Sequence, residues 1–400
     1  MPTAMIRRIA LTAVLATLPG CATTGAGGDV TSAPAPGAPA AQPAQGWSVN
    51  AREHVDLWLH GYALLQQDTA RVPFFRRGYR DQMLADRRSR NITTALDVDR
   101  ERLAARLAAN PALVNGQFLA MYFASFEDMQ RVVELAIRVQ GDPRGAPDQQ
   151  MAQFVALVSA NFPTAADRDW LRTFMQALAD ERRLFYRDYW AAEQSRRAPA
   201  RAAVTAAWDR YQSGFRRFLQ NTQQDRGEIL LSLPLNGEGR TAQVANGFQM
   251  VGVNFPATAA AAPEALYTFA HEAMLRIASS AVDDNITPAE QRSGVGAAHT
   301  SNAAVRGGLL LIEKVAPDLA TGYQRYYLAS IGAQVPSGDP QRAFAAAFPL
   351  PGASGWFAGP RIRRSDPRPP RRCGSRRGVR KTFGSSRIWL QAARHPPEAR

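Results

Sequence analysis

The chain has 400 residues, of which 46% are hydrophobic and 20% charged, enough for one large domain or two smaller ones with a sizeable core. Its formal net charge is +14, but thirteen Lys or Arg and only two acidic residues lie after residue 360, so the remainder is near neutral. This excludes a body that binds nucleic acid through bulk positive charge. Two isolated cysteines, Cys21 and Cys373, exclude a disulfide framework and a cysteine zinc cluster.

The first residues have the layout of an export signal. Arg7 and Arg8 precede an apolar run at 9–18, which is too short to span a bilayer as a helix but suits the core of a signal peptide. The run ends in Leu18-Pro19-Gly20-Cys21, which resembles the lipobox of bacterial lipoproteins. The resemblance implies a signal peptide at 1–20, cleavage before Cys21, and acylation (palmitate or a similar chain) of that cysteine. An ordinary secretory signal with an incidental cysteine is the alternative.

Residues 21–46 are rich in Ala, Pro, Gly and Thr and are predicted to be a disordered tether. With two or three acyl chains, Cys21 would hold the protein stably at a membrane. Ala22 is not the aspartate that signals retention at the inner membrane. The expected location is therefore the cell envelope, at the outer membrane facing the periplasm if the organism is Gram-negative.

Residues 47–224 are predicted to form a helical region. Ser125 and Thr164, each followed by an aspartate three residues later, resemble capping boxes. His54 and His60 are six residues apart, on different sides of the first helix, and are interpreted as surface or capping histidines. The predicted segments are 49–67, 74–90 (helix or loop), 97–109, two within 113–140, 151–160, 164–190 and one after 199.

After residue 225 the periodicity changes to that of short strands, predicted at 228–233, 241–245 and 248–255. The dipeptide Asn236-Gly237 is a turn signal, so the strand at 241–245 is expected to run back beside the strand at 228–233. A helix then begins near Pro263, and a capped helix follows Thr287. Further helices are predicted at 303–315 and 319–331. The fold class is α+β and predominantly helical, with a helical region at 47–224 and an α+β region at 225–350.

The helix after Pro263 carries His271-Glu272, and this order of strand, loop and helix resembles the zincin metallopeptidases, especially the gluzincins with their HExxH helix. The resemblance covers about residues 228–331. It implies that His271 binds zinc, that Glu272 is the catalytic general base for peptide hydrolysis, and that Glu313 is the third ligand. Leu275 stands where the second histidine belongs, so His299, or else Asp283 or Asp284, is the expected substitute.

Three interpretations of this helix remain open. One is a working zinc peptidase, with Tyr323, Tyr326 or Tyr327 as oxyanion donors. Another is a degenerate zincin-like domain without catalysis, which binds a peptide or protein or has a structural role. The last is an unrelated α+β fold in which His271 is a hydrogen-bonded helix histidine.

Residues 351–400 form a basic tail rich in Pro and Arg, without apolar periodicity. It is interpreted as the product of a reading-frame shift near codon 350. A disordered basic arm and a solvated tail without a role are the alternatives.

Overall fold

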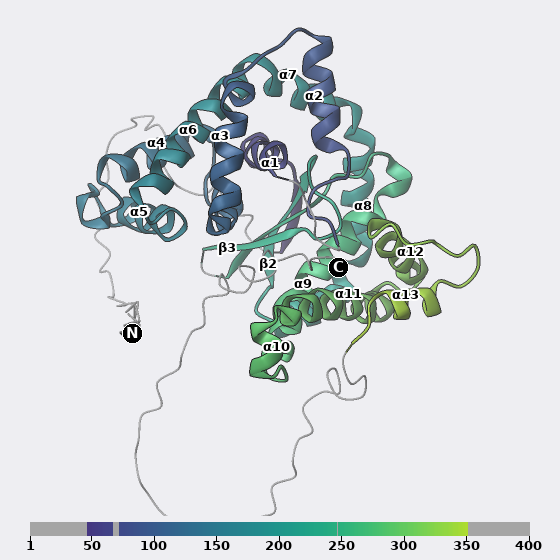
Figure 1. Ribbon diagram of the computed structural model, residues 1–400. Coiled ribbons are helices and arrows are strands. Elements are labelled where there is room, and N and C mark those ends of the chain that lie inside the picture. The colour runs from purple at the N-terminus through teal and green to yellow at the C-terminus, as the bar shows by residue number, and fades with distance from the viewer. Residues whose placement is uncertain (1–45, 67–71, 246, 351–400) are drawn as a thin grey trace, which may run out of the picture. The chain divides into compact units, whose positions relative to one another are not determined.

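The computed structural model describes residues 46–66, 72–245 and 247–350 (Figure 1). The predicted signal peptide, Cys21, all but the last residue of the tether, and the basic tail lie outside the described residues. Among the described helices, none is both long and apolar enough to cross a membrane.

The predominantly helical α+β fold is confirmed, with a four-stranded sheet among helices. A 3₁₀ helix, η1 (Pro111–Tyr122), replaces one predicted α-helix, and a π-helical turn, η3 (Arg182–Tyr186), joins α6 to α7. The α-helices are α1 (Glu53–Leu65), α2 (Tyr79–Ser89), α3 (Ala95–Ala109), α4 (Phe126–Arg138), α5 (Gln149–Asn161), α6 (Ala165–Glu181), α7 (Arg187–Arg196), α8 (Ala198–Asn221), α9 (Pro263–Asp283), α10 (Pro288–Arg292), α11 (Val295–Val315), α12 (Ala320–Ser330) and α13 (Gln341–Ala347).

The helix starts that were predicted from capping residues are confirmed. The Ser125 side chain accepts a hydrogen bond from the backbone of Asp128 at the start of α4. Thr164 and Asp167 form a reciprocal capping box at α6, and Thr287 forms another with Glu290 at α10. These short-range pairs satisfy backbone N–H groups that have no partner inside the helix, which is why they could be recognised in sequence.

The sheet has the strand order β1-β2-β4-β3, with β1 (Trp47–Asn50), β2 (Arg226–Ser232), β3 (Arg240–Ala245) and β4 (Phe248–Asn254). The pairs β1–β2 and β2–β4 are parallel, and β3 runs antiparallel to β4 at one edge. Every residue of β4, and every residue of β2 except Arg226, is buried. Strands buried on both faces are typical of parallel sheets that helices cover on both sides.

Two predictions about the sheet are wrong. The helix predicted from residue 49 begins only at Glu53, because residues 47–50 form β1 and pair with β2, some 180 residues away in sequence. The strand at 240–245 does not return beside β2, since both edges of β2 are occupied by parallel neighbours. It pairs with β4 instead, and Gly247, which separates the two strands, has a φ of 80° that suits a hairpin turn.

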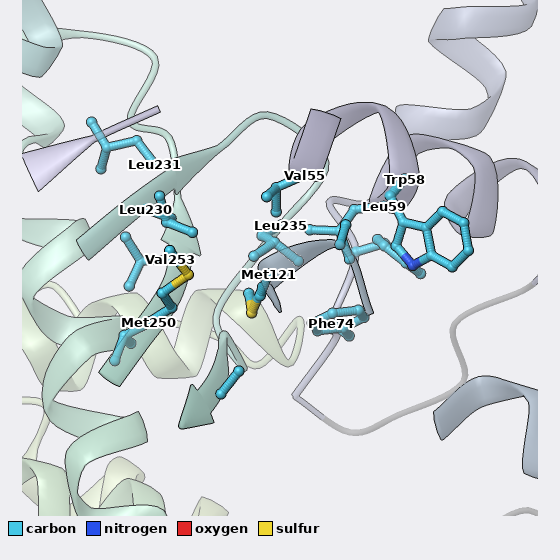
Figure 2. Packing of buried hydrophobic residues seen from close by; sticks show 14 of the residues in the cluster. Val55, Trp58, Leu59, Phe74, Met121, Leu230, Leu231, Leu235, Met250 and Val253 are labelled. Atoms are coloured by element: carbon cyan, nitrogen blue, oxygen red, sulfur yellow. The ribbon is translucent and has the colours of Figure 1, made fainter. Parts of the chain in front are cut away.

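The hydrophobic core is continuous from α1 to α13 and crosses the predicted region boundary at residue 224. Figure 2 shows Val55 and Leu59 of α1 directed toward Leu235. Leu235 and Met121 of η1 both reach β4, because a Cβ built on Gly252 would lie 3.1 Å and 2.8 Å from their side chains. Trp47 of β1 contributes from another side, with its ring 4.9 Å from that of Phe269 on α9. The sheet thus draws strands from both predicted regions into one core.

The interpretation of His54 and His60 as surface or capping residues is wrong, because both are buried in α1. The Nε2 of His54 lies 3.0 Å from the carbonyl oxygen of Phe123, and burial lowers the pKa of His54 to about 4. His60 lies 3.0 Å from the Tyr79 hydroxyl through Nδ1 and 3.1 Å from Glu181 through Nε2. A buried imidazole needs such partners, and they come from segments too distant in sequence to be anticipated.

Candidate functional site

The helix α9 places His271 and Glu272 in the interior. Pro263 occupies the first turn, as predicted, and the helix runs for 21 residues. From Ala265 to Met274 every residue is buried, because α9 packs against β4, α8, α11 and α12. His271 is 1% exposed and Glu272 3%. The pair therefore lies within the core and not on the wall of a cleft.

The two side chains contact each other and the sheet. The Nδ1 of His271 lies 3.2 Å from Oε1 of Glu272, and the Thr241 hydroxyl of β3 donates to Oε2 at 2.9 Å. The ring of Tyr327 on α12 stacks beside the imidazole, with 5.8 Å between the centroids. The Nε2 of His271 is buried and has no hydrogen-bond partner among the described residues. Glu272 is thus held by two neighbours, while the described part of the chain offers no hydrogen-bond partner to one nitrogen of His271.

A second buried carboxylate lies near this pair. Glu238, in the loop between β2 and β3, is 4% exposed and accepts a hydrogen bond of 2.6 Å from Arg240. Burial raises the pKa of Glu238, the Arg240 guanidinium opposes that rise, and the charge of Glu272 adds to it. The Arg240 guanidinium also lies 4.1 Å from the ring centre of Phe74. The result is a compact interior group of charged side chains.

The structure does not bring the other predicted zinc ligands to His271. The backbone of His271 lies level with Gly308 of α11, since a Cβ built on that glycine would be 3.3 Å from the His271 nitrogen. His299 is nine residues earlier on α11, about 13 Å along the helix axis. Glu313 is on α11 too but is exposed, whereas His271 is buried. Asp283 and Asp284 lie beyond His271 by more than three turns of α9.

Leu275, at the position of the missing second histidine, has a packing role. It lies against a small cluster formed by α9 and α11, whose buried members are Ala278, Val282, Ala303 and Ala304. Among the residues that the structure describes, no three His, Cys, Asp or Glu side chains form a group that could hold a metal ion. The described residues therefore do not fit the three-ligand zinc site that the resemblance implies.

The tyrosines of α12 use their hydroxyl groups within the fold. Tyr323 donates to the carbonyl oxygen of Val305 at 2.9 Å, and Tyr327 donates to that of Gly237 at 2.9 Å. Burial raises the pKa of all three tyrosines, including Tyr326. The hydroxyls of Tyr323 and Tyr327 already bind carbonyl oxygens and are therefore not positioned to stabilise an oxyanion. The Tyr326 hydroxyl lies 3.4 Å from that of Thr268.

Sequence reasoning missed a second buried network around Glu181. Its carboxylate accepts hydrogen bonds from Arg87 and Thr94, both at 2.5 Å, and lies 3.1 Å from His60. Burial opposes ionisation of Glu181, but the hydrogen bond with His60 and the charge of Arg87 hold its pKa below the usual range. Burial also lowers the pKa of His60. No short spacing signals this network, because its members come from α1, α2, the N-cap of α3, and α6.

Neither of two cavities, of about 340 Å³ and 500 Å³, is lined by His271 or Glu272. The smaller cavity lies at the start of α1, where Arg52 forms an ion pair with Glu228. The larger one lies at the start of α2. His271 and Glu272 thus belong to an internal hydrogen-bond network, and Leu275 contributes to packing.

Comparisons with known proteins found no relative of this chain. No family model, curated protein or solved structure matches it.

Proposed function

We propose that this chain is a lipid-anchored protein of the bacterial cell envelope, tethered through Cys21, whose folded part has a binding or structural role without catalysis. The observation that carries the proposal is the burial of His271 and Glu272, at 1% and 3% exposure. A hydrolytic centre must admit a substrate to its general base. Here Thr241 binds the Glu272 carboxylate, and the ring of Tyr327 lies against the imidazole of His271.

The same burial supports a degenerate zincin-like domain over a working one. Leu275 packs between α9 and α11, and the predicted ligands His299 and Glu313 lie away from His271. The proposed partners are the membrane, through the anchor, and a peptide or protein ligand; nucleic acid is not among them.

One observation favours the alternative, a zinc-dependent peptidase with a non-standard second ligand. The Nε2 of His271 is a buried nitrogen without a partner among the described residues. A neutral imidazole presents such a nitrogen to a metal ion, and a buried water molecule would satisfy it equally well.

Zinc content and peptidase activity separate the two functions. The full chain is purified in a non-ionic detergent without chelators, together with the variants His271→Ala and Glu272→Gln. We expect substoichiometric zinc in all three proteins by elemental analysis, and no hydrolysis of a peptide library. Palmitate labelling in cells, lost in Cys21→Ser, checks the anchor in the same preparation.

The stability of the two variants gives a second readout. His271→Ala removes a buried ring and should lower the free energy of unfolding by about 2–4 kcal/mol. Glu272→Gln keeps the shape of the side chain and should cost about 1–2 kcal/mol through its altered hydrogen bonds. One zinc per chain that is lost in His271→Ala, with hydrolysis that Glu272→Gln abolishes, would establish the peptidase instead.

A further inference from the structure

Three arginines line the larger cavity, at the start of α2, and none of them has a carboxylate partner among the described residues. The cavity has a volume of about 500 Å³, within the range of small-molecule sites. Arg76, Arg77 and Arg80 line it together with Asp81, which contributes the one carboxylate among the described lining residues. None of the three arginines forms an ion pair with a described residue. The wall therefore carries an excess of positive charge.

Arg76 donates a hydrogen bond to the side-chain oxygen of Gln82 at 3.1 Å, whereas two buried arginines elsewhere in the fold, Arg87 and Arg240, have carboxylate partners. Arg87, two turns further along α2, lies 2.5 Å from Glu181 and 2.9 Å from Asp97. Arg240 is paired with Glu238. Three guanidinium groups beside one carboxylate leave this wall with excess positive charge, which a bound anion would offset.

The backbone at this cavity also offers donors. The first hydrogen bond of α2 runs from Gln82 to Gly78, and no side chain caps the helix. The N–H groups of Arg80 and Asp81 consequently have no acceptor among the described residues. Unpaired N–H groups at a helix start carry partial positive charge and bind anionic oxygens.

The segment that carries these groups is fixed to the core. Arg76 donates its backbone N–H to Pro234 at 2.8 Å, and Phe75 forms an antiparallel bridge with Leu235. Tyr79 is 1% exposed, and its hydroxyl lies 3.0 Å from the Nδ1 of His60. The Arg76 guanidinium lies 5.3 Å from the centre of the Tyr79 ring. The donors are thus held by packing and not by a free loop end.

Apart from Gln66 and Gly78, the remaining described lining residues are apolar or aromatic. Ala63, Pro73, Phe75 and Tyr79 line the cavity and are buried beneath its surface. An inorganic ion would fill only part of 500 Å³, so the cavity has room for an organic group beside the anion. Guanidinium forks match the tetrahedral oxygens of a phosphoryl group and bind two of them at once.

We propose that the cavity at the start of α2 binds a ligand bearing a phosphoryl group, held by Arg76, Arg77, Arg80 and the free backbone N–H groups of the first turn. Two sources share this chemistry: a soluble phosphate ester and the headgroup of a phospholipid. The proposal does not depend on the lipid anchor or on the state of His271.

The test uses the full chain in a non-ionic detergent, with binding followed by microscale thermophoresis. Inorganic phosphate is titrated first, followed by didecanoyl phosphatidic acid and didecanoyl phosphatidylcholine. The pocket variant is Arg76→Gln/Arg77→Gln/Arg80→Gln. The matched control is Arg88→Gln/Arg216→Gln/Arg217→Gln, which removes the same charge from exposed positions that do not line the cavity.

We expect saturable binding by the wild type that weakens about tenfold or more in the pocket variant and less than about twofold in the control. Binding of inorganic phosphate would identify a soluble ester as the source. Binding of phosphatidic acid alone, without phosphatidylcholine, would identify a lipid headgroup. Unfolding midpoints of both variants show that they are folded. Absence of saturable binding by the wild type, or equal weakening in the two variants, would overturn the proposal.

Discussion

At the scale of single residues, burial shifts the pKa of Asp56 strongly. Asp56 of α1 is 1% exposed, and it accepts hydrogen bonds from Trp190 at 3.0 Å and from the backbone N–H of Leu233 at 3.2 Å. Burial raises the pKa of Asp56 to about 7, although these donors oppose the rise. The carboxylate is therefore costly to ionise where it helps to join α1 to the end of β2.

This shift sets a pH dependence with a definite sign. Between the ordinary value of 3.8 and about 7, the native protein binds more protons at Asp56 than the unfolded chain does. The contribution of Asp56 to stability must therefore fall as pH rises through that window. His54, whose pKa falls to about 4, acts in the opposite direction.

The variant Asp56→Asn isolates the aspartate, because asparagine resembles its protonated form. We expect the variant to gain stability relative to wild type as pH rises from 4 to 8, by about 2–4 kcal/mol in total. Urea unfolding of both proteins at several pH values measures this difference, in which the His54 contribution cancels. A difference that does not change with pH would contradict the shifted pKa.

At the scale of elements, the contact of the β2–β3 loop with α9 determines the candidate site. Gly239 in that loop has a φ of 64°. A Cβ at this position would lie 2.7 Å from Cγ2 of Thr268, 2.8 Å from Cγ of Glu272 and 2.9 Å from the carbonyl oxygen of Gly252. The glycine thus permits the close approach that brings Glu238 beside His271 and Glu272.

Substitution of this glycine should cost both backbone strain and packing. We expect Gly239→Ala to lower the free energy of unfolding by about 2–4 kcal/mol. Gly247→Ala is the control, since Gly247 has a φ of 80° but nothing within 4 Å of a built Cβ. The control should cost only about 1 kcal/mol. Equal losses in urea unfolding would show that the contact with α9 does not limit this position.

At the scale of the whole molecule, a strand from the start of the folded part completes a sheet formed mainly by later residues. Trp47 of β1 donates its indole N–H to Gln224 at 2.9 Å, and its ring contacts those of Trp208 and Phe269. The hydrophobic core is continuous on both sides of residue 224. Residues 47–224 and 225–350 should consequently unfold together.

Truncation of this tryptophan tests that coupling. We expect Trp47→Ala to lower stability by about 3 kcal/mol and to leave a single transition, with far-UV circular dichroism and tryptophan fluorescence coincident. The exposed Thr205→Ala in α8 should change the midpoint little. Two separate transitions in the wild type would show that the regions at 47–224 and 225–350 are independent.

The sequence by itself determined the helices, their capped starts at Ser125, Thr164 and Thr287, and the presence of strands before α9, because these depend on residues within a few positions of one another. The lipobox-like motif at Cys21 is likewise a local pattern, and the lipid anchor stays a prediction. The tertiary structure alone decided that 47–50 is a strand, that β3 pairs with β4, and that His54 and His60 are buried. It likewise decided the surroundings of His271, since Thr241, Tyr327 and the face of α11 approach it only through packing between distant segments. Local sequence patterns predict hydrogen bonds and periodicity within a few residues. The partners of a buried polar group depend instead on which distant segments pack around it.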